Sequence, residues 1–174
     1  MSKLIIIAGL PGTGKTTVSN ELSKRLGFFC LHKDSVKESF YDSMKMSSLE
    51  ESKRLGYPSV KMILDLAEEN IARGVDIILE SPFHMTDVGI VFAGWRERYK
   101  ISILSAIMQL DEEERKKRFL ARERHRSHYD QKRTGDYPLE DVSFSYLPEK
   151  RLFLTADRPT HELAEVLVRE IDLL

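Results

Sequence analysis

The stretch LIIIAGLPGTGKTT, residues 4–17, decides the fold of this chain of 174 residues. Its second part, residues 9–17, matches the phosphate-binding loop pattern G-x-x-x-x-G-K-[ST], and an apolar, β-branched run precedes it. The residues that follow have the spacing of one apolar helix face: Val18, Leu22 and Leu26. A strand, a loop and a helix in this order are the context that supports such a match. The sequence therefore predicts a site for nucleotide phosphates at this loop.

The residue types of the loop suit that chemistry. Glycines permit positive φ and let the backbone close on phosphate oxygens, while successive N–H groups and the helix N-terminus attract anions. Lys15 is expected to reach the β- and γ-phosphates, and the Thr16 hydroxyl to bind Mg²⁺. We therefore expect ATP and Mg²⁺ as cofactors. The residues expected to hold the nucleotide are Gly9, Pro11, Gly12, Thr13, Gly14, Lys15, Thr16 and Thr17.

Length and composition favour a single domain over residues 1–174, since 41% of the residues are hydrophobic. A net charge of −1 gives no overall field that would recruit nucleic acid or an anionic membrane. No apolar run is long enough to span a bilayer, and the MSKLIII start is too short and wrongly flanked for a signal peptide. The single Cys30 excludes an internal disulfide. We expect a cytoplasmic monomer or homodimer without a membrane partner.

Strand-like runs alternate with helical patterns along the chain. The expected strands are Lys3–Ala8, Phe28–His32, Val75–Leu79, Ile101–Leu110 and Leu152–Thr155. The expected helices are Lys15–Leu26, Ser35–Met44, Ser48–Leu55, Val60–Arg73, Asp87–Tyr99, Asp111–Arg126 and His161–Leu174. This alternation predicts a three-layer α/β fold with a mainly parallel sheet. Ligands of such sheets bind beyond the carboxyl ends of the strands, so chemistry is expected there.

Two acidic residues follow expected strands. Asp34 comes after the second strand, where it can cap the next helix or face the γ-phosphate and accept a proton from an acceptor hydroxyl. Glu80 comes directly after the third strand. It can complete the Mg²⁺ shell, hydrogen-bond the acceptor, or be a surface acid at the start of a loop. His84, four residues later, is interpreted as a loop residue rather than a base.

A basic run follows the fourth strand. Nine basic residues lie between positions 115 and 133: Arg115, Lys116, Lys117, Arg118, Arg122, Arg124, Arg126, Lys132 and Arg133. If the helix is continuous, Arg118, Arg122 and Arg126 share one face. Such a face is usually solvated, but the run leads into the Gly-containing loop 134–138, a composition that suits a mobile lid over residues of about 115–140. His125 and His128 have no nearby carboxylate or Cys cluster that would favour a metal pair.

With these motifs, nearly the whole chain resembles the small P-loop kinases. That group includes nucleoside monophosphate, shikimate and gluconate kinases, chloramphenicol phosphotransferase and the kinase domain of polynucleotide kinases. The closest general resemblance is to the AAA-type small kinases. The phrase LDEEERKKRFLARERHR, residues 110–126, resembles their lid helix, and HKDS, residues 32–35, resembles the segment whose Asp contacts the acceptor hydroxyl.

The resemblance implies roles for individual residues. Arg118 would lie against adenine, Arg122 would reach the phosphates, and Asp34 would contact the acceptor. It also implies a parallel sheet in the order 2-3-1-4-5, with an acceptor-binding helical insert at about 35–73. ESPFH, residues 80–84, stands where polynucleotide kinases show an Asp-x-Thr segment, and no Gly-x-Pro-Arg follows the third strand. These departures argue against a nucleic-acid acceptor and against a nucleoside monophosphate kinase.

The leading interpretation is therefore ATP- and Mg²⁺-dependent transfer of the γ-phosphoryl group to a hydroxyl of a small molecule. Lys15, Asp34 and Arg122 would be catalytic, and Thr16 and Glu80 would hold the metal. A polynucleotide 5′-hydroxyl kinase needs a basic groove outside the lid, and residues 34–70 show no marked basic excess. An ATP-binding or ATPase module without an acceptor is the third alternative. The identity of the acceptor is open. Segment 35–60 is a candidate for its pocket, since it mixes aromatic and Met residues with charged ones: Phe40, Tyr41, Met44, Met46, Tyr57, Lys37, Glu38, Lys45 and Glu50.

Overall fold

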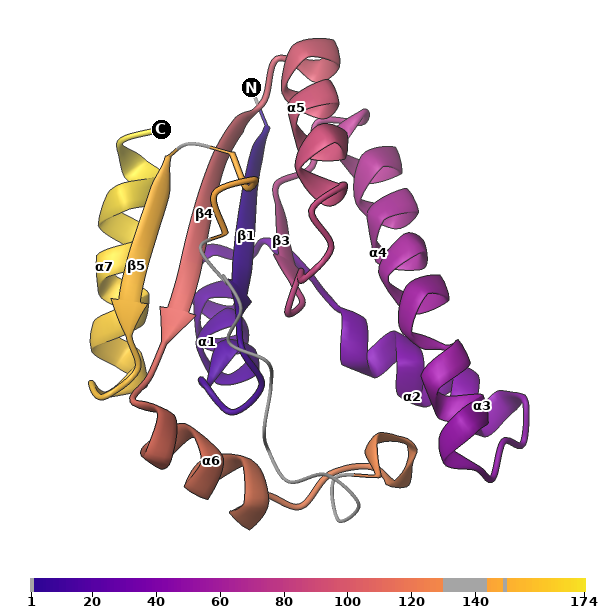
Figure 1. Ribbon diagram of the computed structural model, residues 1–174. Coiled ribbons are helices and arrows are strands. Elements are labelled where there is room, and N and C mark those ends of the chain that lie inside the picture. Colours follow the sequence, from indigo (N-terminus) through magenta and orange to yellow (C-terminus); the bar gives the residue numbers. More distant parts are fainter. Residues whose placement is uncertain (1, 130–143, 149) are drawn as a thin grey trace.

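The computed structural model describes residues 2–129, 144–148 and 150–174. Its elements follow in the order β1 (Lys3–Gly9), α1 (Lys15–Leu26), β2 (Phe29–His32), α2 (Lys33–Ser43), α3 (Leu49–Arg54), α4 (Gly56–Ile71), β3 (Ile77–Glu80), α5 (Val88–Tyr99), β4 (Ser102–Gln109), α6 (Glu112–Ala121), the 3₁₀ turn η1 (Arg126–His128), β5 (Arg151–Thr155) and α7 (Thr160–Asp172). Figure 1 shows the sheet between two groups of helices, with α6 and η1 beyond its lower edge.

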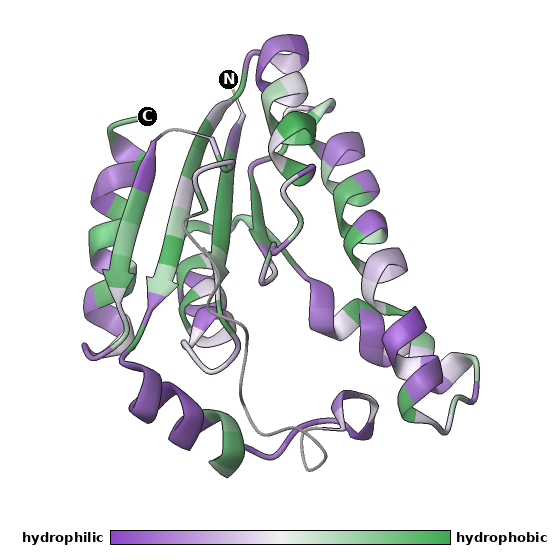
Figure 2. Cartoon of the chain, in the orientation of Figure 1, coloured by the Kyte–Doolittle hydropathy of each residue, from purple (hydrophilic) through white to green (hydrophobic). Residues whose placement is uncertain are grey.

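The apolar run at the start of the chain becomes the central strand, β1. Side chains alternate along it, so Leu4 and Ile6 pack into one half of the core and Ile5 and Ile7 into the other. Residues of α4 and α5 complete the first half, and residues of α1 and α7 complete the second. This arrangement is the expected three-layer α/β fold. Figure 2 shows the same pattern in hydropathy, with β1, β3 and β4 largely hydrophobic and most of α6 hydrophilic.

The strand order is β2-β3-β1-β4-β5, and every pairing between these strands is parallel. The predicted order 2-3-1-4-5 is confirmed. In the register of the sheet, Ile7 lies beside Glu80 and Glu80 beside His32. Because the strands are parallel, the loop after β1, the end of β3 and the start of α2 meet at one edge of the sheet. The candidate site residues of these three segments therefore lie close together at that edge.

The predicted helix Asp111–Arg126 is wrong at its carboxyl end. Asp111 caps α6 as expected, accepting hydrogen bonds from the backbone N–H groups of residues 113 and 114 at 3.0 and 3.2 Å. The helix ends at Ala121, and Arg122 is extended, with φ −82° and ψ 137°. Beyond it, Arg126 forms an ion pair with Asp42 of α2 at 2.8 Å. The segment after Ala121 thus leaves the helix and contacts α2. The predicted lid residues 130–140 lie outside the described residues.

Helix α2 also differs from the prediction, because it begins at Lys33 and has His32 at its N-cap position. Asp34 is therefore inside the first turn and does not cap the helix. The separate helical piece predicted at 48–55 is confirmed as α3, which begins with a capping box formed by Ser48 and Glu51. Pro58 lies in the first turn of α4, where the missing N–H is tolerated.

Candidate functional site

The phosphate-binding loop at the end of β1 depends on glycines in the left-handed region. Gly9, Gly12 and Gly14 have φ values of 134°, 95° and 80°. A Cβ at Gly9 would come within 2.3 Å of the Met108 carbonyl oxygen, and one at Gly12 within 2.8 Å of the Arg115 carbonyl oxygen. The loop therefore needs glycine both for its backbone conformation and for its close packing against β4 and α6. Gly14 stands at the N-cap position of α1, so the N-terminus of that helix opens into the loop.

Lys15 is the first residue of α1 and is only 7% exposed. Its Nζ donates a hydrogen bond to the carbonyl of Leu10 in the same loop, at 3.0 Å. Burial lowers the pKa of Lys15, while the nearby carboxylates of Glu80 and Asp34 act in the opposite direction. The ammonium is thus held within the loop at the point where the phosphates of a nucleotide are expected.

Thr16 and Glu80, the two predicted metal ligands, are in contact. The Thr16 hydroxyl donates to Glu80 Oε2 at 3.1 Å, and His32 Nδ1 donates to the same oxygen at 3.1 Å. Glu80 is only 4% exposed, so the interpretation of it as a surface acid is wrong. The hydrogen bonds of His32 with Cys30 and with Glu80 raise its pKa to about 10. A hydroxyl and a carboxylate side by side fit Mg²⁺, which prefers oxygen ligands and commonly takes only one or two carboxylates beside phosphates.

Asp34 lies at the start of α2 and faces the same cleft as Lys15. Its carboxylate forms ion pairs with Lys33, at 3.1 Å, and with Arg124. Burial alone would raise the pKa of Asp34, but the charges of Lys33 and Arg124 together hold it well below its usual range. Asp34 is therefore ionised at neutral pH. The structure thus favours a cleft-facing carboxylate over the capping role considered from the sequence.

Arg118 and Arg122 both line the cleft, but they reach it from different conformations. Arg118 is helical and donates to Glu114 at 2.9 Å and to the carbonyl of Ala156 at 3.0 Å. Arg122 is extended and lies with its guanidinium over the ring of Phe119, 4.6 Å from the ring centroid. The predicted helix face shared by Arg118, Arg122 and Arg126 is therefore wrong, because α6 ends before Arg122.

Several functional candidates were missed from the sequence. Arg115 is 1% exposed, and its Nη1 donates to the carbonyl of Pro11 at 3.1 Å, so it supports the phosphate-binding loop from α6. Arg124 pairs with Asp34, and Lys53 lines the cleft. Nothing in the residue pattern separates these basic residues from their solvated neighbours. Only the tertiary fold does so.

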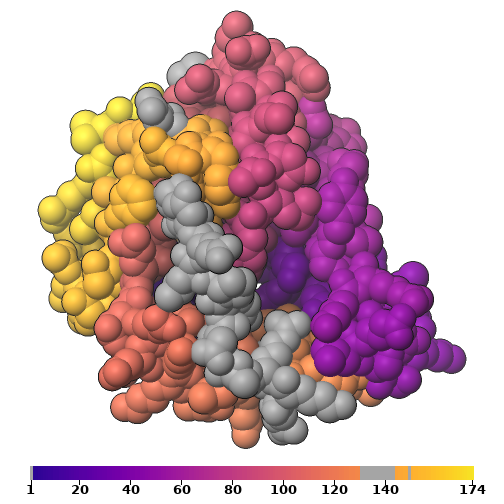
Figure 3. Space-filling view, in the orientation of Figure 1, coloured from indigo at the N-terminus to yellow at the C-terminus, as the bar shows by residue number. Residues whose placement is uncertain are grey.

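The cleft has a volume of about 630 Å³, enough for a nucleotide phosphate chain and a second small molecule. In Figure 3, the indigo N-terminal segment is visible at the bottom of a hollow bordered by the purple and magenta elements. Of the residues of segment 35–60 considered for the acceptor pocket, Lys37 lines the cleft. Tyr41 is buried against His125 and Tyr129, whereas Met44 and Tyr57 are exposed to solvent. His84 is in a loop, as predicted, and it lines the cleft.

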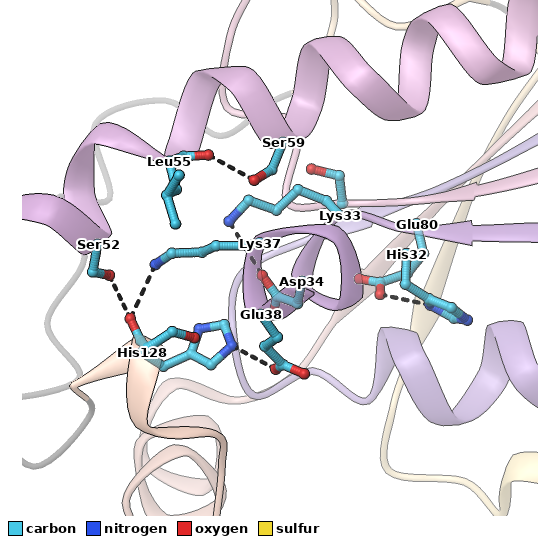
Figure 4. A network of polar contacts seen from close by, with 12 residues as sticks. His32, Lys33, Asp34, Lys37, Glu38, Ser52, Leu55, Ser59, Glu80 and His128 are labelled. Atoms are coloured by element: carbon cyan, nitrogen blue, oxygen red, sulfur yellow. Dashed lines mark hydrogen bonds and ion pairs between the residues drawn. The ribbon is translucent and has the colours of Figure 1, made fainter. Parts of the chain in front are cut away.

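The two histidines considered as a metal pair bind carboxylates of α2. His125 Nε2 lies 3.0 Å from Asp42, and His128 Nε2 lies 2.7 Å from Glu38. Figure 4 shows His128 directed toward Glu38 on one side of Asp34, and His32 directed toward Glu80 on the other. Within residues 2–129, 144–148 and 150–174, no three His, Cys, Asp or Glu residues gather as a metal site.

The parallel sheet and the loop that closes around Lys15 define a P-loop nucleotide-binding fold. A family model described as an AAA domain matches residues 4–137, which is more than half of the chain. The chain therefore belongs to this AAA domain family. No curated protein sequence gives a significant match. In the described part of the chain, no helix is both long and apolar enough to cross a membrane.

Solved structures share the fold over nearly the whole chain. A protein of Chloroflexus aurantiacus J-10-fl with a proposed kinase activity is 23% identical, with a TM-score of 0.76, and the match covers 98% of this chain and 96% of that one. The APS kinase CysC of Mycobacterium tuberculosis, solved with AMPPNP and APS, is 16% identical, with a TM-score of 0.66 and 98% of each chain covered. A sugar kinase from Janibacter sp. HTCC2649 is 16% identical, with a TM-score of 0.59 and 99% and 95% covered. At these identities the similarity concerns the fold alone.

Proposed function

We propose that this protein is a kinase that transfers the γ-phosphoryl group of Mg-ATP to a hydroxyl of a small molecule. One observation carries the proposal. The phosphate-binding loop and the Thr16–Glu80 pair line the same cleft as Asp34 and residues of α2 and α3, so a second substrate has room opposite the nucleotide. The kinase activities named for structures of this fold, on APS and on a sugar, support the same class of reaction.

The nucleotide half of the cleft would be built by the loop and by α6. Lys15 and the backbone N–H groups of the loop would hold the β- and γ-phosphates. Thr16 and Glu80 would hold Mg²⁺, which when bound would neutralise the charge of the phosphates. Arg122 would stabilise the transferring group, and Arg118, which contacts the Ala156 carbonyl, would lie against adenine. His32 would keep the Glu80 carboxylate oriented through its hydrogen bond.

The acceptor half would be built by α2, α3 and the segment after α6. Asp34 would accept a hydrogen bond from the acceptor hydroxyl and align its oxygen with the γ-phosphorus. As the new O–P bond forms, the bond to the bridging oxygen of ADP breaks, and the hydroxyl proton passes to Asp34. The low pKa of Asp34 suits a loose transition state, in which the hydroxyl loses its proton late and orientation matters most. Residues of about 35–73 are proposed as the acceptor-binding insert and those of about 115–140 as the lid.

The experiment that tests the proposal is a screen for acceptor-dependent ADP release. Mg-ATP and the full chain are incubated with sugars, hydroxy acids, phosphorylated alcohols, aminoglycoside and other hydroxylated antibiotics, and 5′-hydroxyl oligonucleotides. We expect release above the background rate with a small-molecule alcohol, and none with the Lys15→Ala variant. Stimulation by oligonucleotides alone would replace the proposal with a polynucleotide kinase. Steady ADP release that no acceptor changes would replace it with an ATPase module.

A further inference from the structure

The acceptor half of the cleft is strongly basic. Among the described residues, the cations that line the cleft are Lys15, Lys33, Lys37, Lys53, Arg118, Arg122 and Arg124, and the carboxylates are Asp34 and Glu80. Three of the cations, on α1 and at the end of α6, are assigned above to the nucleotide, whose Mg²⁺ complex is itself an anion. The other four lie on α2, α3 and the segment before η1, and the acid that the described part of the lining places beside them is Asp34.

The contacts of these four side chains divide them into two pairs. Lys33 and Arg124 bind Asp34 and offset its charge. Lys37 lies farther along α2 and Lys53 lies on α3, and both line the cleft there. Figure 4 shows Lys33 and Lys37 extending in the same direction from α2, toward Ser52 and Leu55. The excess of positive charge is therefore at the end of the cleft beside α3.

Lys37 and Lys53 differ in how they are held. Lys37 is 4% exposed, and its Nζ donates to the carbonyl of Ser127 at 3.3 Å, so its ammonium has a fixed position in the wall of the cleft. Lys53 is exposed, and within the described residues its side chain makes neither a hydrogen bond nor an ion pair. One lysine is thus in place before any ligand arrives, and the other is available to close on it. An anion between them would offset the cost of keeping a charged lysine buried.

The pKa values of two histidines that line the cleft are consistent with the same positive environment. Burial, together with the charges of Arg124, Lys37 and Lys33, lowers the pKa of His128 to about 3, against the opposing charge of Asp34. Burial also lowers the pKa of His84, with Lys15 and Lys33 acting in the same direction. Both imidazoles are therefore neutral at physiological pH, and they add hydrogen-bonding groups without opposing an anion.

We infer that the acceptor carries an anionic group in addition to its hydroxyl, and that Lys37 and Lys53 bind this group while Asp34 binds the hydroxyl. This inference rests on the proposed kinase function and narrows its substrate class to phosphorylated, sulfated or carboxylated alcohols. Two-ended binding also explains how the hydroxyl is aligned, since an acceptor held at its charged end has little freedom to turn away from Asp34.

The first test compares matched acceptors. Each pair contains an anionic alcohol and its neutral counterpart: a sugar phosphate with the free sugar, a hydroxy acid with its amide, and a sulfated alcohol with the unsulfated one. We expect acceptor-dependent ADP release from anionic members only, and the productive pair identifies the type of anion. Equal phosphorylation of a neutral member would overturn the inference and leave the kinase proposal intact.

The second test uses variants. Lys53→Ala should raise the KM for the anionic acceptor roughly tenfold or more, the loss that corresponds to one hydrogen bond to a charged group. The KM for ATP should not change, because Lys53 lies on α3, away from the nucleotide half. Lys24→Ala, which removes an exposed lysine of α1, is the matched control and should leave both constants unchanged. An unaltered acceptor KM in Lys53→Ala and in Lys37→Met, with both variants folded, would contradict the inference.

A binding experiment separates failure of the inference from failure of the kinase proposal. With Mg-AMPPNP filling the phosphate-binding loop, inorganic phosphate and sulfate are titrated at constant ionic strength, and thermal stabilisation is followed. We expect saturable stabilisation that Lys53→Ala weakens and Lys24→Ala does not. Such binding without any acceptor-dependent turnover would support the anion site and refute the kinase. Stabilisation that does not depend on Lys37 or Lys53 would refute the anion site.

Discussion

At the scale of single residues, Lys15 combines two properties that oppose each other, since it is charged and almost fully buried. Burial lowers its pKa, and the carboxylates of Glu80 and Asp34 act in the opposite direction. Its ammonium donates a hydrogen bond to one loop carbonyl, that of Leu10. Burying an ammonium group costs free energy, and a bound anion would offset that cost. This is the reason to expect phosphates beside Lys15.

Lys15→Ala should therefore abolish tight binding or turnover of Mg-ATP and leave the fold intact. The substitution removes the ammonium that faces the phosphates and, at the same time, the cost of burying it. Nucleotide affinity by calorimetry and the unfolding midpoint of the nucleotide-free protein check both statements. Lys24→Ala, on the exposed side of the same helix, serves as the control. Wild-type affinity and turnover in Lys15→Ala would show that the loop does not bind phosphates in this way.

Asp34→Asn should spare ATP binding and reduce phosphoryl transfer by on the order of 10²–10⁴, the scale of losing a general base. The amide is nearly the same size, but it cannot take the proton and it lacks the charge that holds Lys33 and Arg124. The rate is measured with the acceptor that the screen identifies. A wild-type rate would restrict the carboxylate to a structural ion pair and turn attention to Glu80.

The same variant makes a prediction for stability against pH. The folded-state pKa of Asp34 is lowered, so its ionised form stabilises the folded state at pH values above the unfolded-state pKa, which is near 3.8. That contribution is lost as the pH falls through and below this value. We expect wild type to exceed Asp34→Asn in free energy of unfolding by a constant amount between pH 5 and 7, on the linkage argument, and by less in stronger acid. A difference that does not change with pH would mean that the charge is unimportant for stability.

At the scale of elements, α6 contributes to the candidate nucleotide site in two ways, through its buried face and through its carboxyl end. Its buried face carries Arg115, which donates to the carbonyl of Pro11 and packs beneath Gly12 of the loop. Its end delivers Arg118 and Arg122 to the cleft. The helix therefore supports the phosphate-binding loop through its buried face and supplies guanidinium groups to the cleft at its carboxyl end.

Arg115→Leu should destabilise the fold by about 2–4 kcal/mol, because it removes a buried hydrogen-bonded side chain and leaves the Pro11 carbonyl without this donor. The loop should also lose its preferred conformation, so the Kd for Mg-ATP should rise. Urea unfolding and nucleotide titration measure the two effects. Lys117→Ala, on the exposed side of α6, is the control and should change neither. A stable variant with unchanged affinity would show that the loop holds its shape without this helix.

Arg122→Ala should lower kcat more than it weakens ATP binding, because its guanidinium is expected to meet the phosphoryl group mainly in the transition state. Arg118→Ala should instead mainly raise the KM for ATP. Steady-state kinetics with both substrates varied separates these effects, and Arg96→Ala on the exposed side of α5 is a matched control. If kcat of Arg122→Ala equals that of wild type, Arg122 belongs to a solvated surface.

At the scale of the whole molecule, the fold was predictable because its signals are local. The apolar β-branched strands, the glycine loop and the helix that follows each occupy one short segment, and the resemblance supplied the strand order. The Thr16–Glu80 contact was predictable because both residues follow strands that are neighbours in the sheet. The end of α6 was not, because Arg124 and Arg126 are held by acids of α2 about ninety positions earlier in the chain.

The basic character of the acceptor half was hidden for the same reason. Counted along the sequence, residues 34–70 have no marked basic excess, since acidic residues accompany the lysines. In the fold, Glu50 and Arg54 pair with each other on the exposed side of α3, while Lys37 and Lys53 turn to the cleft. A count of charges along a chain does not record which side of a helix each charge occupies, and that division produces the proposed anion site.

The carbonyl of Ser127 accepts hydrogen bonds from Lys37 of α2 and from Ser52 of α3, so one backbone oxygen fastens η1 to both helices. An acceptor that engages the Lys37 ammonium competes with this oxygen for the same hydrogens. Binding of the acceptor and weakening of the hydrogen bond that holds η1 would then be coupled equilibria. Each would favour the other by the same free energy. The protein would then sense a filled site through one shared hydrogen-bond donor, Lys37.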